Sequence, residues 1–158
     1  LEPSSEKSYL PTPPTAKQYA DCCNEFWWVA PQVAKGLWRR EILYAKHMFE
    51  HYIREQLVKM LIWHIGVRTD FRVYPGYLGK YIHKHLEPAL WEMFQKTYSD
   101  ASYDATWDAL EVAGNLFRIV ALHVGKQFGF KYPHEEDDRV SAHIQYVRTL
   151  PGNAKTIY

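Results

Sequence analysis

The stretch TAKQYADCCNEFWWVAPQVAKGL, residues 15–37, decides the fold. Its apolar side chains recur every three or four residues, which is the spacing of one face of an α-helix. Thr15 precedes the pattern and suits the N-cap position, and the pattern extends to about Lys35 or Leu37. Because Pro31 lies inside the pattern, we expect a kink there, with Gly36 as a weak point near the end.

The rest of the chain continues with helical periods, and no convincing alternation of period two occurs. Further helices are expected at residues 42–66, 78–85, 87–97, 103–128 and 135–150. The sequence therefore predicts an all-α fold, an antiparallel bundle of about five helices. Residues 1–15 hold four prolines and are expected to form an extended linker, followed by a helical domain at 16–150 and a tail at 151–158.

Composition restricts the class of protein. The chain has 158 residues, of which 47% are hydrophobic and 16% aromatic, so it is not a disordered chain. The formal net charge of +1 gives no reason to expect nucleic acid as a partner. No run of 18 apolar residues occurs, so we expect no membrane association. The adjacent Cys22 and Cys23 are poorly placed to pair with each other, which favours a reducing, cytoplasmic location.

Six residues of the first helix fall on one stripe, at alternating intervals of four and three. They are Asp21, Glu25, Trp28, Gln32, Lys35 and Arg39. Such a stripe can hold a cationic organic molecule at Glu25 and Trp28, while Lys35 and Arg39 contact phosphate oxygens. The alternative is the solvent-facing side of an amphipathic helix, and spacing alone favours this second interpretation.

Two other sets have possible chemistry. Asp104 and Asp108 belong to an acidic face near the start of the 103–128 helix, which suits either the helix dipole or a polycationic ligand. His47 and His51 fit an H-x-x-E-H zinc signature, but no third ligand is evident, so we predict no metal site. The chain has no P-loop, G-x-G-x-x-G, G-x-S-x-G or C-x-x-C motif, which makes catalysis by this chain alone doubtful.

Several segments resemble the aminoglycoside 6-adenylyltransferases, also called streptomycin adenylyltransferases. The similarity extends over roughly residues 12–133 and is most specific at Cys22 to Trp28. The segments that carry it are DCCNEFWWV (21–29), VAKGLWRREIL (33–43), KMLIWHIG (59–66), GKY (79–81) and, more weakly, KYP (131–133). Family members have two domains, and the N-terminal one carries a Gly-Ser turn and paired aspartates that hold Mg²⁺ and the ATP phosphates. This sequence contains neither a Gly-Ser dipeptide nor an Asp-x-Asp motif, so it resembles the C-terminal helical domain only.

The resemblance implies roles for the first-helix stripe. Glu25 is expected to bind the cationic aminoglycoside and to orient or deprotonate its attacking hydroxyl, with Trp28 as a further substrate contact. Asp104 and Asp108, on the acidic face described above, are also predicted to contact the substrate. Lys35 and Arg39 are expected to bind the ATP phosphates. The complete enzyme would use ATP and Mg²⁺ to transfer AMP to the 6-hydroxyl of streptomycin, with Mg²⁺ held mainly by the N-terminal domain. Whether Glu25 or a residue of that domain is the base stays open.

A different class of function is also compatible with the sequence. The chain would then be a free-standing helical module that binds another protein or dimerises through exposed Trp and Tyr side chains, without catalysis. Under the first interpretation, by contrast, the chain is an enzyme domain that is inactive alone. An upstream Gly-Ser and Asp-x-Asp segment in the same reading frame would favour the enzyme.

Overall fold

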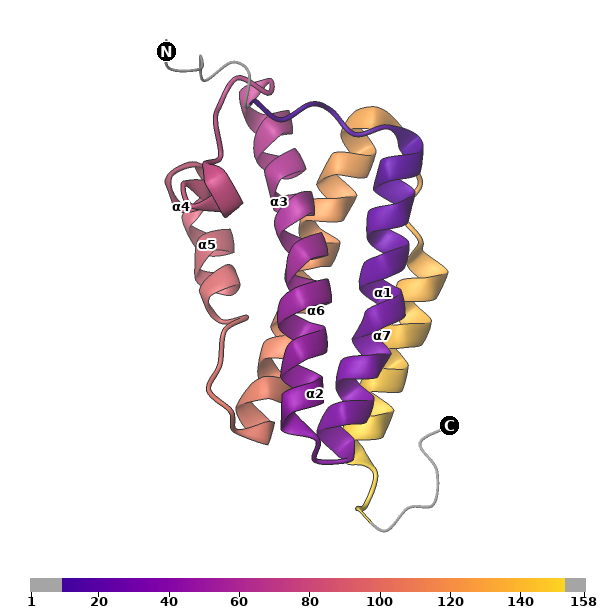
Figure 1. Ribbon diagram of the computed structural model, residues 1–158. Coiled ribbons are helices and arrows are strands. Elements are labelled where there is room, and N and C mark those ends of the chain that lie inside the picture. The colour runs from indigo at the N-terminus through magenta and orange to yellow at the C-terminus, as the bar shows by residue number, and fades with distance from the viewer. Residues whose placement is uncertain (1–9, 153–158) are drawn as a thin grey trace.

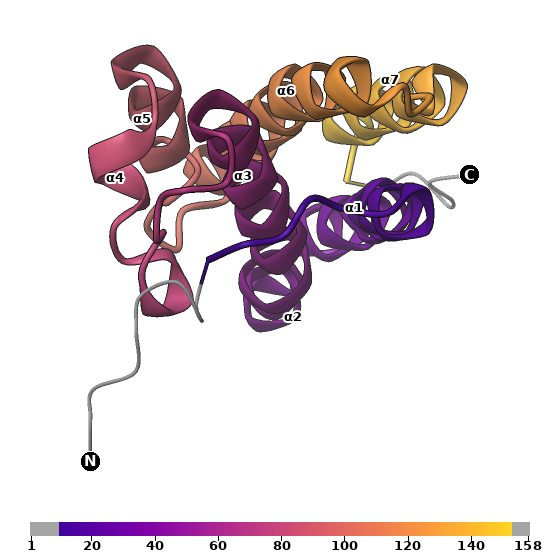
Figure 2. The ribbon, with the colours of Figure 1, turned by 90° about the horizontal axis from the view of Figure 1, so that it is seen from above.

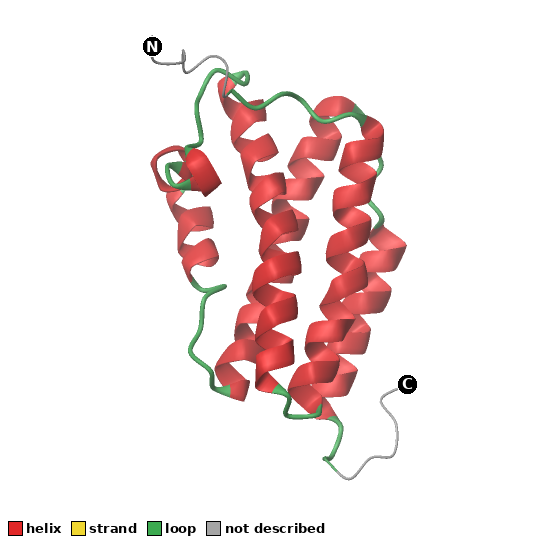
Figure 3. Cartoon of the chain, in the orientation of Figure 1, coloured by secondary structure: helices red, strands yellow, loops and turns green. Residues whose placement is uncertain are grey.

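The computed structural model describes residues 10–152, and within this range the chain forms helices and loops but no strand (Figures 1 and 3). This confirms the predicted all-α class. The helices are α1 (Ala16–Trp38), α2 (Ile42–His47), η2 (Met48–Ile53), α3 (Arg54–Thr69), η3 (Tyr77–Gly79), α4 (Ile82–His85), α5 (Pro88–Gln95), α6 (Tyr103–Phe128) and α7 (His134–Thr149). Residues 10–15 of the predicted linker are not helical, whereas residues 1–9 and 153–158 lie outside the described part.

The chain reverses direction between successive long helices (Figure 1). In that view α1 descends, the run from α2 to α3 ascends, α5 descends, α6 ascends and α7 descends. α1 packs against α7, α6 and the α2–α3 run, and α3 packs against α6. Seen from above, α4 and α5 lie beside α3 at one edge of the bundle (Figure 2). None of the helices in the described range is long and apolar enough to span a bilayer.

α1 begins at the predicted N-cap and, as predicted, continues past Pro31, with its end at Trp38 close to the predicted end. The Thr15 hydroxyl accepts a hydrogen bond from the Gln18 backbone N–H, and the Gln18 side chain accepts one from the Thr15 N–H, which is a capping box. Packing on several sides stabilises the helix on both sides of Pro31. Gly36 is not a weak point. A Cβ there would lie 2.8 Å from Cδ1 of Tyr44, so the glycine lets α2 pack closely.

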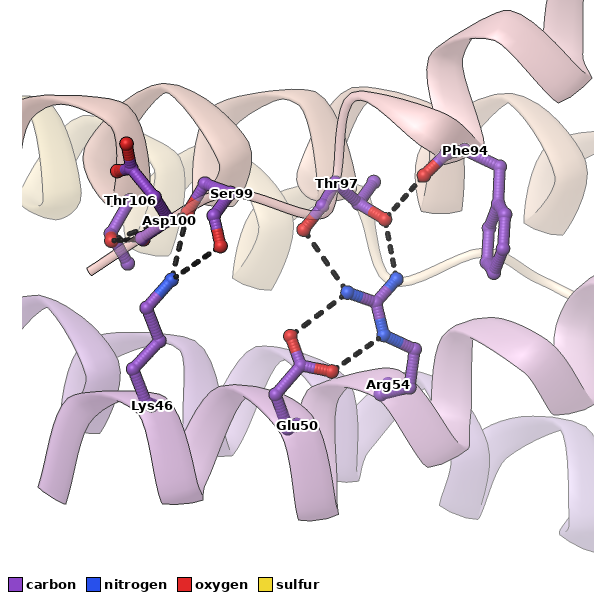
Figure 4. Close-up of polar contacts among 8 residues, drawn as sticks. All are labelled: Lys46, Glu50, Arg54, Phe94, Thr97, Ser99, Asp100 and Thr106. Atoms are coloured by element: carbon purple, nitrogen blue, oxygen red, sulfur yellow. Dashed lines mark hydrogen bonds and ion pairs between the residues drawn. The ribbon is translucent and has the colours of Figure 1, made fainter. Parts of the chain in front are cut away.

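One long run, residues 42–69, combines α2, a π-helical turn and α3. In the π-helical turn, Glu50 lies four residues before Arg54 and its carboxylate accepts two hydrogen bonds of 3.0 Å from the Arg54 guanidinium (Figure 4). Arg54 also donates to the hydroxyl and the carbonyl oxygen of Thr97, which follows α5. Nearby, Lys46 Nζ donates to Ser99 Oγ at 2.7 Å. These bonds fasten the α2–α3 run to the segment that leads into α6.

The predicted helix over 78–85 is wrong in its first half. The chain instead forms the single 3-10 turn η3 and, after a break, the four-residue α4. The physical reason is the backbone at Leu78 and Gly79, where φ is 56° and 75°, because an α-helix has no such left-handed residues. The bounds of α6, in contrast, match the prediction, with Ser102 as its N-cap and the left-handed Gly129 at its end.

Candidate functional site

The stripe predicted on α1 lies on the outer surface of the bundle. Trp28 exposes 71% of its surface, Asp21 and Arg39 are exposed, and the remaining three residues are half-buried. Successive residues turn by about 100° around an α-helix, so all six lie within roughly 80° of one another. The side of α1 that carries Phe26 and Trp27 is in the core. The stripe is therefore one continuous face, available to a ligand or a partner.

Two grooves of about 520 Å³ each border this face, and both are lined by Asp21 and Glu25. The first groove lies between α1 and α3, and the second lies between α1 and the start of α7. From α3 the first groove receives Gln56, Lys59 and Trp63. The second is lined by Asn24 and Trp28 of α1 and by Glu136 of α7. Asp21 and Glu25 thus form a ridge of carboxylates between two open grooves.

Three carboxylates line the two grooves, those of Asp21, Glu25 and Glu136, and that of Glu25 is free to bind a ligand. Asp21 forms an ion pair of 2.6 Å with Lys17, and Glu136 forms one of 2.7 Å with Arg139. Within residues 10–152, Glu25 makes neither an ion pair nor a hydrogen bond. A half-buried carboxylate beside an exposed indole suits an organic cation, because the indole face and the carboxylate both attract positive charge.

Lys35 and Arg39 occupy the same face at its other end. Lys35 lies ten residues after Glu25, which corresponds to roughly 15 Å along the helix axis. Neither cation forms an ion pair with a described residue. Between them and Glu25, Gln32 accepts a hydrogen bond of 3.3 Å from the Tyr44 hydroxyl, which ties α2 to the face. A single extended ligand, cationic at one end and anionic at the other, matches this distribution of charge.

Asp104 and Asp108 do not join this face. Asp108 forms an ion pair of 2.9 Å with Arg148 in the last turn of α7, whereas Glu136, which shares a groove with Glu25, lies in the first turn. The twelve residues from Glu136 to Arg148 correspond to roughly 18 Å of helix. The structure therefore separates the two aspartates from Glu25, because they cap the opposite end of the bundle.

The α3 side of the site was missed by the sequence interpretation. Gln56, Lys59 and Trp63 lie in the helix predicted over residues 42–66, to which no part in the site was given, yet they line the groove that Glu25 also lines. A signal was present, since Lys59 and Trp63 belong to the KMLIWHIG segment that carries part of the family resemblance. Glu136 lies in the helix predicted over residues 135–150, to which no part in the site was given. Spacing along one helix cannot reveal what a second helix contributes.

The cysteines beneath the groove are not candidates for a nucleophile. Cys22 and Cys23 are both buried free thiols, and the Cys22 thiol donates a 3.4 Å hydrogen bond to the Gln56 carbonyl oxygen. Burial raises the pKa of Cys22 far above its usual range and raises that of Cys23 to about 12. Both side chains therefore stay protonated and act as small core residues.

Comparisons with known proteins show which proteins the chain is similar to. The family model described as streptomycin adenylyltransferase matches residues 1–147. An aminoglycoside 6-adenylyltransferase from Campylobacter jejuni is 35% identical over 131 residues, covering 83% of this chain and 45% of that protein. Its counterpart from Bacillus subtilis is 34% identical over 133 residues, covering 84% and 47%.

A solved structure extends the likeness to the fold. The crystal structure of an aminoglycoside 6-adenyltransferase from Bacillus subtilis superposes with a TM-score of 0.81 at 32% identity, covering 92% of this chain and 55% of that one. The chain thus spans about half the length of the relatives it matches. On the match to its family model and this shared fold, the chain belongs to the aminoglycoside 6-adenylyltransferase family.

Proposed function

We propose that this chain is the C-terminal, substrate-binding helical domain of an enzyme that transfers AMP from ATP to the 6-hydroxyl of streptomycin. In the complete protein, a cytoplasmic one, an N-terminal nucleotidyltransferase domain forms the other wall of the cleft. The chain alone is inactive. The observation that carries the proposal is the unpaired Glu25 beside the exposed Trp28, between two grooves and on the same face as Lys35.

Glu25 acts on the antibiotic. Its carboxylate attracts a guanidinium or ammonium group, and Trp28 offers a flat surface for the same cation. When the 6-hydroxyl oxygen attacks the α-phosphorus of ATP, the bond to the bridging oxygen breaks and pyrophosphate leaves. Glu25 orients this hydroxyl and takes up its proton. The half-buried position of Glu25 suits it for this purpose, because it is reachable and partly shielded from solvent.

Lys35 and Arg39 act on ATP. Their positive charges lie at the other end of the face and offset the negative charge of the phosphates during the in-line transfer. Within the described residues, no group of three His, Cys, Asp or Glu side chains could hold a metal ion. In the complete protein, Mg²⁺ would be held mainly by the N-terminal domain and would help to offset the charge of the phosphates.

Calorimetric titration of streptomycin into the complete protein tests this proposal. We expect saturable binding that strengthens when a non-hydrolysable ATP analogue and Mg²⁺ are present, since both ligands share one cleft. The 158-residue chain by itself is expected to produce no adenylated streptomycin. Heat release that is the same with Glu25→Gln as with the wild type would contradict the role of the carboxylate, and adenylation by the chain alone would contradict the division of the site.

A further inference from the structure

The groove between α1 and α3 is lined by a cation that has no role in the site so far. Lys59 of α3 lines this groove together with Glu25 of α1, and its side chain is exposed. Trp63, which is 8% exposed, and Cys22, which is 2% exposed, contribute uncharged lining. The inference drawn from Lys59 rests on the proposed function and adds a residue to the same site.

The ammonium group of Lys59 lies near α1. Burial and the neighbouring Cys23 raise the pKa of the Cys22 thiol, whereas the positive charge of Lys59 acts in the opposite direction, which requires that this charge be close to the thiol. Cys22 precedes Glu25 by three residues, which corresponds to roughly 4.5 Å along the helix axis. The cation of Lys59 and the carboxylate of Glu25 therefore lie at nearly the same level of one groove.

Lys59 and Glu25 do not neutralise each other. Asp21, which also lines the groove, is paired with Lys17 at 2.6 Å. Lys59 and Glu25, in contrast, form no ion pair and no side-chain hydrogen bond in the part of the chain that the structure describes. The space between them is open to ligands that present a hydroxyl or a cation to Glu25 and an anion to Lys59.

A lysine in this groove is unfavourable for an aminoglycoside alone, because the positive charges repel each other. The arrangement becomes favourable once a phosphate group lies between them. The α-phosphorus of ATP must come within about 3–3.5 Å of the hydroxyl oxygen that attacks it, and Glu25 orients this hydroxyl. Lys35 lies roughly 15 Å from Glu25 along α1, so it suits the phosphates that are farther from the reacting atoms.

We propose that Lys59 is a catalytic residue that binds a non-bridging oxygen of the α-phosphate of ATP. Its ammonium group stays protonated and donates a hydrogen bond to that oxygen. The hydroxyl oxygen bonds to the α-phosphorus, the bond to the bridging oxygen breaks and pyrophosphate leaves, while Glu25 takes up the hydroxyl proton. Throughout this step, Lys59 offsets the negative charge on the non-bridging oxygens.

Steady-state kinetics of Lys59→Met in the complete protein test this role, because methionine keeps an unbranched side chain and removes the charge. We expect kcat to fall at least tenfold and the melting temperature to stay within about 2 °C of the wild type, since Lys59 is exposed. The KM for the aminoglycoside should be unchanged or lower, because a repelling charge is gone. A raised KM would indicate a damaged groove and would contradict the proposal. Lys126→Met, at an exposed lysine of α6, is the matched control and should change neither constant.

The second readout concerns the α-phosphate itself. ATP with sulfur at one non-bridging position of the α-phosphate exists as two diastereomers, and sulfur accepts hydrogen bonds weakly. The diastereomer that presents sulfur to Lys59 should therefore react more slowly with the wild type. In Lys59→Met, the ratio of the two rates is expected to change at least threefold. An unchanged ratio, or a wild-type kcat for Lys59→Met, would overturn the proposal.

The same experiments separate this proposal from the proposed function. If Glu25→Gln and Lys35→Ala lower turnover and Lys59→Met does not, the role of Lys59 is wrong while the proposed function stands. If all three variants keep wild-type kinetics, both proposals are wrong.

Discussion

The Nδ1 atom of His64 lies 2.7 Å from the Nδ1 atom of His123, so one of these nitrogens donates a hydrogen bond to the other. His64 Nε2 is 2.9 Å from Glu87, which also pairs with Arg68 at 2.9 Å. Because the Glu87 carboxylate accepts a hydrogen bond from Nε2, neutral His64 accepts at Nδ1 and His123 donates. The chain of contacts joins α3, α6 and the residue that precedes α5.

This arrangement predicts that stability falls in mild acid. Burial lowers the pKa of His64 below its ordinary 6.5, and the nearby His123 and Arg68 lower it further, against the opposing effect of Glu87. The unfolded chain therefore binds a proton at a higher pH than the folded one. The stabilising contribution is complete above pH 6.5 and is lost as pH falls from there toward the lower folded pKa. Thermal melts between pH 7.5 and 5.5 measure it.

The matching variants identify the histidine responsible. His64→Gln is expected to flatten the decline in melting temperature over this pH interval, because the group that titrates differently in the two states is gone. His134→Gln, at an exposed position at the start of α7, is expected to keep the wild-type slope. Equal slopes in the wild type and His64→Gln would show that the decline has another origin.

Substitution of Asp137 is expected to cause a large loss of stability. It is 1% exposed and accepts hydrogen bonds from Arg118, the Tyr132 hydroxyl at 2.6 Å and the Ser141 hydroxyl at 2.8 Å. Asp137→Asn leaves Arg118 without its counter-charge, and we expect a loss of about 2–3 kcal/mol in the free energy of unfolding, measured in urea. The exposed neighbour provides the control, since Asp138→Asn should change stability by less than about 0.5 kcal/mol. Similar losses for the two variants would argue against the network.

A substitution at either end of the α1 face is expected to lower the activity of the complete protein. In the complete protein, Glu25→Gln and Lys35→Ala are each expected to reduce turnover at least tenfold, which equals about 1.4 kcal/mol of transition-state stabilisation. Steady-state kinetics with streptomycin and ATP measure this. Glu41→Gln and Lys126→Ala, both exposed and outside the face, serve as controls. Wild-type kinetics for both Glu25→Gln and Lys35→Ala would show that the face is an ordinary solvated surface.

Substitution of Trp28 is expected to change substrate affinity rather than folding. An indole that is 71% exposed contributes little to the core, so Trp28→Leu should leave the melting temperature within about 2 °C of the wild type. Loss of the flat surface should raise the KM for the aminoglycoside at least fivefold, with a smaller change in kcat. Tyr146→Leu, another exposed aromatic on α7, tests for a nonspecific effect and should leave KM unchanged.

The sequence predicted those parts of the structure that depend on local signals. The ends of α6 follow from Ser102 and Gly129, and the start of α1 follows from Thr15, because caps are encoded within a few residues. Leu78 adopts a left-handed backbone, which a leucine in the sequence does not indicate. The predicted helix over 78–85 was therefore wrong in its first half. The π-helical turn was also not foreseen, because its apolar residues fit an α-helical period.

The candidate site was predictable along α1 and not across it. The stripe from Asp21 to Arg39 lies on one surface, as the intervals of three and four require. Its partners Lys59, Trp63 and Glu136 come from other helices, and only the packing of α3 and α7 brings them to Glu25. The same packing moves Asp108 away, since it pairs with Arg148 instead.

The wide turn at Met48–Ile53 sets the angular register of everything that follows it in the long run. A π-helical turn holds about one residue more than an α-helical turn. Because this turn takes up the extra residue, deleting one residue there would give a regular α-helix and would leave α3 at nearly the same angle relative to α2. Lys59 and Trp63 would then stay in their groove. A single-codon deletion in the regular part of α3 before Lys59, in contrast, would rotate both side chains by about 100° about the helix axis and out of the groove.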